Sequence, residues 1–212
     1  MTLSKQGTSF IEQSRRQQLI EATIACLADE GYAGASLAKV AQRAAISKSV
    51  VIYYFAGKDE LMKATVQVIF EELRRSIQPR VEAASTARAQ LRAYIESELR
   101  FLEQHRTRLL ALSAILMNHR EADGRLRLRE EAEKVNLRTW MQILERGQAS
   151  GEFRAFAVKP MAATLMHAIN GALSQWVADP KLSLSAYAAE LVMIFELATR
   201  AVGRASTPRK RS

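Results

Sequence analysis

Cysteine is almost absent from this chain of 212 residues, which contains only Cys26. A single cysteine cannot form an intramolecular disulfide or a zinc site of paired cysteines. Its thiol is either inert and buried, which we favour, or a redox switch. The three histidines, His105, His119 and His167, are scattered and lack the HExxH spacing of a zinc hydrolase. Since glycine-rich phosphate loops and nucleophile elbows are also missing, we expect neither an enzyme nor a cofactor.

Long apolar runs are missing as well. The strongest apolar stretch, 109–117, is far shorter than a membrane span and is interrupted by Ser113. The first residues lack the uninterrupted apolar run of a secretion signal. The sequence therefore predicts a cytoplasmic protein that does not contact membranes.

Basic residues are in excess, with 31 Lys and Arg against 22 Asp and Glu, but their distribution is more informative than the total. More than half of the net charge of +9 lies in residues 197–212, which hold five basic residues and no acidic one. The segment 31–58 also has no acidic residue, and its basic residues are Lys39, Arg43, Lys48 and Lys58. An acid-free basic segment within a domain indicates nucleic-acid binding better than net charge does.

The same segment has the pattern of two short helices joined by a tight turn. Ser36 is placed to cap a first helix that ends at Arg43. After a connection at 44–46, Ser47 is placed to cap a second helix. Helical spacing puts Val50, Val51 and Tyr54 on the inner face of this helix, and Lys48, Ser49 and Tyr53 on its outer face. The pattern predicts a helix-turn-helix, whose second helix suits the major groove of DNA.

These residues closely resemble the tetracycline-repressor (TetR) family of bacterial transcription regulators. The matching segments occur in the family's order and spacing at 15–22, 30–32, 36–44, 46–48, 53–55 and 58–61. A looser resemblance to the family's regulatory domain covers 151–154, 169–172 and 179–180. The resemblance implies an all-α homodimer that binds double-stranded operator DNA and responds to a small-molecule effector. We expect a repressor rather than an activator, with a helical protein-protein adaptor as the alternative.

The DNA-binding residues follow from the outward positions together with the resemblance. The predicted set is Arg15, Arg16, Ser36, Lys39, Ser47, Lys48, Ser49, Tyr53, Tyr54 and Lys58. Within it we assign Lys58 and Arg15 or Arg16 to phosphates, and Lys48, Ser49 and Tyr53 to bases. Three positions depart from the family pattern: Ala45 and Ser49 replace glycines, and Ile52 replaces a tyrosine. A left-handed backbone at Ala45 would cost roughly 1 kcal/mol or more.

Helical periodicity and the placement of glycine and proline predict an all-α protein. Helices are expected at 14–30, from 58 toward Pro79, and at 86–104, 107–118, 125–149, 160–178 and 185–202. We divide the chain into an N-terminal three-helix helix-turn-helix domain at 11–57, a larger helical ligand-binding and dimerisation domain at 58–202, and a basic disordered tail at 203–212. The N-terminal residues 1–10 are also expected to be disordered.

The last two predicted helices have more apolar surface than one helical bundle needs. They are either central core helices or, as we favour and the resemblance implies, they pair across a two-fold axis with a second copy. The predicted dimer-interface residues are Ile169, Ala172, Trp176, Leu191, Phe195 and Ala198.

Large side chains in the middle helices, Tyr94 among them, are candidates to line an effector cavity. The predicted ligand-binding residues are Phe101, Met117, Trp140, Met166, His167 and Asn170. The last two lie in an apolar helix, where a buried polar group needs a partner. Ordinary core packing explains the apolar members equally well, and an internal hydrogen bond or a wet dimer seam explains His167 and Asn170. No motif identifies the effector.

Overall fold

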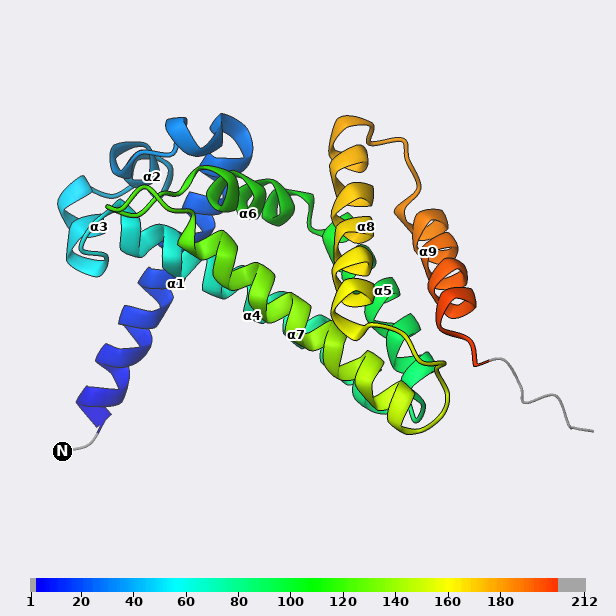
Figure 1. Cartoon of the computed structure of the whole chain (residues 1–212). Coiled ribbons are helices and arrows are strands. Elements are labelled where there is room, and N and C mark those ends of the chain that lie inside the picture. Colours follow the sequence, from blue (N-terminus) through cyan, green and yellow to red (C-terminus); the bar gives the residue numbers. More distant parts are fainter. Residues whose placement is uncertain (1–2, 202–212) are drawn as a thin grey trace, which may run out of the picture. The chain divides into compact units, whose positions relative to one another are not determined.

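The computed structural model describes residues 3–201 of the chain. Within these residues it contains nine α-helices and no strand, apart from an isolated backbone bridge between Phe153 and Arg200 (Figure 1). The helices are α1 (Leu3–Gly34), α2 (Leu37–Arg43), α3 (Lys48–Tyr54), α4 (Lys58–Ala83), α5 (Ala87–Gln104), α6 (Arg106–Asn118), α7 (Arg127–Ala149), α8 (Val158–Ala178) and α9 (Leu184–Thr199). The predicted all-α fold is confirmed.

The helix boundaries agree with the sequence-based ones to within three residues for α5 to α9. Two helices are longer than predicted. Helix α1 begins at Leu3, so the disorder predicted for 1–10 is wrong from residue 3 onward, because no proline interrupts this stretch. Helix α4 continues four residues past Pro79, since the proline removes one backbone donor near the end of a 26-residue helix. The predicted disordered tail at 203–212 lies outside the described residues.

Gly31 interrupts α1 near its C-terminal end. Its backbone has φ 69° and ψ −175°, a conformation that residues with a Cβ rarely adopt. The regular helix therefore ends at Glu30, as the sequence predicts. The chain then turns through 31–36 toward α2.

Contacts between residues divide the described chain into two compact units. Unit 1 comprises residues 3–76 and 101–134, and unit 2 comprises residues 77–100 and 135–201. Helix α6 is therefore packed in the same unit as α1, α2 and α3. The domain boundary predicted at residue 58 separates the DNA-binding part from the ligand-binding and dimerisation part, and it stays a prediction.

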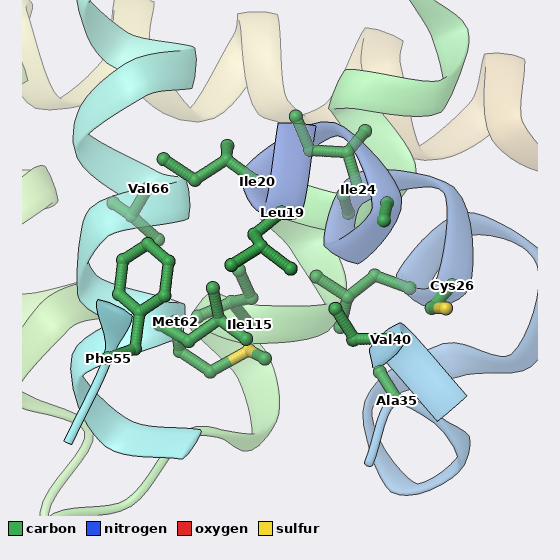
Figure 2. Packing of buried hydrophobic residues seen from close by; sticks show 14 of the residues in the cluster. Leu19, Ile20, Ile24, Cys26, Ala35, Val40, Phe55, Met62, Val66 and Ile115 are labelled. Atoms are coloured by element: carbon green, nitrogen blue, oxygen red, sulfur yellow. The ribbon is translucent and has the colours of Figure 1, made fainter. Parts of the chain in front are cut away.

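Unit 1 has a continuous apolar core to which several helices contribute (Figure 2). Leu19 and Ile24 of α1, Val40 of α2, Met62 of α4 and Ile115 of α6 all belong to this cluster. Each fully buried aliphatic side chain of this size contributes about 1.5–3 kcal/mol. The core thus holds the two short helices α2 and α3 against the longer ones.

In unit 2, α8 and α9 turn their wider apolar faces inward. This contradicts the predicted dimer interface, because five of its six residues are buried within the single chain: Ile169, Ala172, Trp176, Leu191 and Phe195. Ala198 is half-buried. The sequence shows two apolar stripes on each helix but does not say which one the unit itself covers. On α9 the stripe left exposed contains Met193, Ile194 and Leu197.

Candidate nucleic-acid interface

Helix α2 begins as the sequence predicts. Ser36 has extended backbone angles, and its hydroxyl accepts a hydrogen bond from the backbone N–H of Lys39 at 3.2 Å. This bond satisfies a donor that the first helical turn leaves free. Val40 and Ala41 are buried beneath the helix, whereas Lys39 is exposed.

The turn after α2 contains a strained residue. Ala45 has φ 55° and is the one non-glycine residue with positive φ among the described residues. Backbone hydrogen bonds on both sides fix the turn, from Ala45 N–H to the Gln42 carbonyl at 3.1 Å and from Ile46 N–H to the Ala41 carbonyl at 3.0 Å. Ala45 therefore has the left-handed backbone that glycine adopts without strain.

We expect Ala45→Gly to raise the free energy of unfolding by somewhat less than 1 kcal/mol, because relief of the left-handed strain exceeds the added entropy of the unfolded chain. Urea unfolding followed by circular dichroism measures the change. Ala38→Gly is the matched control, since Ala38 is exposed within α2 and its replacement should lower stability by up to about 1 kcal/mol. Equal losses in both variants would contradict strain at Ala45.

Helix α3 begins at the expected residue, but without the expected cap. Ser47 occupies the N-cap position, yet its side chain makes no capping hydrogen bond. Its hydroxyl instead lies 2.8 Å from the hydroxyl of Ser49. The predicted capping role of Ser47 is wrong because this neighbouring hydroxyl replaces the backbone donor as its partner.

The inward and outward faces of α3 agree with the prediction. Val51 is fully buried, and Val50 and Tyr54 are half-buried. The outer face exposes Lys48 and Ser49, together with Ile52 at 48% and Tyr53 at 75%. The Tyr53 ring meets the Tyr54 ring edge-on, with 5.0 Å between the centroids. This outer face is therefore partly basic and partly apolar.

In the folded protein, two acidic side chains lie beside the basic residues of segment 31–58, so this surface is not free of acids. Lys39 pairs with Glu30 at 3.5 Å, and Arg43 pairs with Asp29 at 2.6 Å. Both acids lie just before the segment 31–58, so folding brings them beside cations that appear unopposed in the sequence. The hydrogen bond to Asp29 raises the pKa of Arg43. Among the described residues Lys48 forms no ion pair.

Arg16 fixes the far end of α3. Its guanidinium donates a hydrogen bond to the backbone carbonyl of Tyr54 and lies 4.2 Å above the centre of the Phe55 ring. It also pairs with Glu60 at 3.5 Å. Arg15, the other predicted phosphate contact, donates to the Gln18 side chain. The observed role of Arg16 is therefore to position α3.

Lys58 is engaged in a network that joins α4 to the end of α1. Its Nζ donates to the backbone carbonyl of Tyr32 at 2.8 Å and lies 4.2 Å above the centre of that tyrosine's ring. The Tyr32 hydroxyl is 2.9 Å from Nδ1 of His119, whose Nε2 is 2.9 Å from Oδ1 of Asp59. Partial burial lowers the pKa of Lys58. Local sequence patterns do not indicate this network, because His119 is 87 residues from Tyr32.

The predicted effector residues differ in burial and in the unit to which they belong. Trp140 and Met166 are buried in unit 2, and Phe101 is buried in unit 1. Met117, also in unit 1, is 53% exposed. His167 and Asn170 are exposed, so the premise that they are buried polar groups is wrong for the single chain. The inward face of α8 is formed by neighbouring residues, which turns these two side chains outward.

Among residues 3–201, no group of three His, Cys, Asp or Glu side chains is placed to hold a metal ion. Over the same residues, no helix combines the length and the apolar character needed to cross a bilayer.

Comparison with known proteins matches residues 19–65 to the model of the bacterial regulatory proteins of the tetR family. This segment belongs to the TetR family. The match covers the second half of α1, all of α2 and α3, and the first turns of α4. The TetR resemblance of the sequence is thereby confirmed where its motifs are most specific.

Two relatives share the TetR segment over a longer stretch. The chain is 42% identical over 86 residues to the HTH-type transcriptional regulator BetI of Paraburkholderia phytofirmans, which is 40% of this chain and 44% of that protein. It is 38% identical over 84 residues to BetI of Pectobacterium carotovorum, covering 39% and 43%. The aligned stretch thus spans less than half the length of these relatives.

Solved structures share the fold over most of the chain. A TetR-family regulator from Rhodococcus sp. has a TM-score of 0.76 at 19% identity, covering 87% of this chain and 98% of its own. The regulator FadR from Bacillus subtilis, solved in complex with stearoyl-CoA, has a TM-score of 0.73 at 22% identity, covering 84% and 96%. At such identities the likeness establishes a TetR-like fold and leaves the effector open.

Proposed function

We propose that the protein is a homodimeric, DNA-binding transcriptional repressor that a small molecule releases from its operator. The observation that carries this proposal is the outer face of α3, where Lys48 lacks an ion pair while Ile52 and Tyr53 remain exposed on a short helix. Exposed apolar side chains beside a cation suit the major groove, where bases present both hydrogen-bond acceptors and thymine methyl groups. The family of residues 19–65 supports the same function.

The geometry divides the predicted DNA-binding residues into two groups. The first group is proposed to approach base edges, because its members are exposed on α3: Lys48, Ser49 and Tyr53, to which the structure adds Ile52. The others are proposed to position the helices or to reach phosphates at the margin: Arg15, Arg16, Ser36, Lys39, Ser47, Tyr54 and Lys58. Ile52 cannot supply the hydroxyl of the family's usual tyrosine, but it can contact a thymine methyl.

The proposed dimer uses the exposed stripe of α9 in place of the buried one predicted from the sequence. Met193, Ile194 and Leu197 recur at helical spacing, and Leu197 is 63% exposed. A contiguous apolar stripe on a monomer surface indicates an interaction site. In a dimer with a two-fold axis, this stripe packs against the same stripe of the second copy. The two-fold axis also matches the symmetry of an inverted repeat in DNA.

Regulation is proposed to act through unit 2. The FadR structure from Bacillus subtilis contains a bound acyl-CoA, which shows that a protein of this fold can hold a small molecule. A ligand that binds one conformation of a dimer more tightly shifts the population toward that conformation. Repression follows if the DNA-bound dimer blocks access to a promoter and the effector favours the other conformation.

The test combines DNA selection with a variant of the proposed interface. Selection from random DNA is expected to yield an inverted repeat whose half-site centres lie about one helical turn apart. Leu197→Glu should convert the dimer to a monomer and weaken binding to that repeat on the order of 100-fold, because the two half-sites are no longer bound by one particle. Mobility shift and light scattering on the same samples measure both properties.

Val135→Glu is the matched control, since Val135 is also an exposed apolar residue of unit 2, at 65%. This variant should remain dimeric and bind the repeat normally. A Leu197→Glu protein that stays dimeric would contradict the proposed interface. Full-affinity binding of one half-site by a monomer would contradict the proposed mode of DNA recognition.

A further inference from the structure

Unit 2 contains a buried carboxyl group without a complete set of partners. Glu98, in α5, is only 7% exposed. Its Oε2 is buried and has no hydrogen-bond partner among the described residues. Burial raises the pKa of this carboxyl to about 7, and no neighbouring charge contributes to the shift. An acid in this position therefore lacks the counter-charge that buried carboxylates normally have.

The basic side chains of unit 2 near Glu98 in the sequence do not neutralise it. Arg92 pairs with Glu196 at 2.7 Å, and Arg80 is directed to Glu96 and to the Ser97 hydroxyl. Arg100 is exposed at the end of this segment. Arg80 and Arg92 are thus engaged by other side chains, and no neighbouring charge contributes to the pKa of Glu98.

Two aromatic rings belong to the same part of the unit. Tyr94 precedes Glu98 by one helical turn, so both side chains lie on one face of α5. The Tyr94 ring lies against the Trp140 ring of α7, with 4.2 Å between centroids and a tilt of 59°. Burial, followed by the nearby Glu98 charge, raises the pKa of the Tyr94 hydroxyl, so tyrosine remains neutral. An acid beside electron-rich rings is the combination that stabilises an organic cation.

We propose that Glu98, Tyr94 and Trp140 form a binding site in unit 2 for an effector that contains a protonated amine or a quaternary ammonium group. The proposal rests on the regulatory function proposed above and names the chemical class of its effector. The cation supplies the charge that Glu98 lacks, while its alkyl groups pack against the rings. The site is selective because a neutral molecule of the same shape leaves the carboxylate unpaired.

A metal ion is a poorer occupant of this position. Hard divalent cations require several oxygen ligands, and the described residues contain no group of three acidic or histidine side chains suited to a metal. Tyr94 is kept neutral by its surroundings and Trp140 contributes a second aromatic ring beside it, which favours an organic cation over a hydrated metal ion.

Titration calorimetry on the full chain at pH 8, where most Glu98 is ionised, tests the site. The probes are tetramethylammonium, benzyltrimethylammonium and tetraphenylphosphonium, together with neopentylbenzene, the neutral carbon isostere of the second. At least one cation should bind the unmodified protein, and benzyltrimethylammonium should bind at least about tenfold more tightly than its isostere. Glu98→Gln should remove that preference by weakening cation binding about tenfold or more.

Glu103→Gln is the matched control, because it removes the same charge from an exposed position of the same helix. This variant should bind the cations as the unmodified protein does. Failure of all three cations to bind, or equal binding by the Glu98→Gln variant, would overturn the proposed site.

A mobility shift with the selected inverted repeat separates this proposal from the proposed function. Release of DNA by the cation, lost in Glu98→Gln, supports both. Glu98-dependent cation binding that leaves DNA affinity unchanged keeps the site and contradicts the regulation. DNA binding without any cation binding contradicts the site alone.

Discussion

The Glu98→Gln variant is expected to be more stable than the unmodified protein at pH 8, by roughly 3 kcal/mol at most, and about equally stable at pH 4. In the folded protein burial raises the pKa of Glu98 from its usual 4.5 to about 7. The folded state therefore holds this proton more tightly than the unfolded chain does. As pH rises from about 4.5 to about 7, the unfolded chain releases the proton first, and the free energy of unfolding falls.

Urea unfolding of both proteins at pH 4, 6 and 8 measures the difference. Glutamine does not titrate, and all other groups are shared, so the difference between the two proteins isolates Glu98. Glu103→Gln, at an exposed position of the same helix, is the control for the loss of one negative charge. A stability difference that is the same at every pH would show that the Glu98 carboxyl does not titrate in this range.

Gly147→Ala is expected to lower the free energy of unfolding by roughly 3 kcal/mol, the upper range for overpacking. A Cβ at this position of α7 would lie 2.0 Å from Cδ2 of the Phe153 ring. That ring is buried, and the Phe153 N–H donates to the Gly147 carbonyl at 2.9 Å, so the backbone is held as well. The ring can move aside only if the buried groups around it also shift.

Gly171→Ala is the control for this substitution. Gly171 also lies within a helix, but a Cβ there meets nothing within 4 Å, so alanine should raise stability by up to about 1 kcal/mol in the monomer. Phe153→Leu combined with Gly147→Ala should recover part of the loss. A loss below about 1 kcal/mol in Gly147→Ala alone would mean that the ring relocates readily.

The sequence was most informative where function depends on local pattern. Helical spacing, the cap at Ser36 and the turn residues placed α2 and α3 correctly. They also separated the buried Val51 from the exposed Tyr53. These features depend on residues within a few positions of one another, which is the range that helical periodicity can read.

Features that depend on distant residues were missed. Pairing of α2 with Asp29 and Glu30 requires the chain to turn at Gly31, and the His119 contacts join residues far apart in sequence. The inner and outer stripes of α8 were likewise indistinguishable, which placed His167 in the interior by mistake. The tertiary arrangement decides each of these cases, and periodicity alone does not encode it.

Glu98 was also missed, although the sequence held a signal for it. Leu91, Ile95 and Leu102 recur at helical spacing and are buried, and Glu98 falls on the same stripe of α5. A charged residue on an apolar stripe is worth examining as a binding group, since its desolvation needs compensation. A lone acid of this kind belongs to no paired-acid or metal motif.

The ion pairs at α2 bear on how such a protein finds its target in a chromosome. Non-specific attraction to DNA grows with the number of phosphates that free cations neutralise, and it determines how long a protein slides along the duplex. Because Glu30 and Asp29 pair with Lys39 and Arg43, helix α2 has fewer free cations for the phosphates of random sequence than its composition indicates. We expect brief encounters at non-cognate sites, a shallow dependence of affinity on ionic strength, and residence times governed by the match between α3 and the bases.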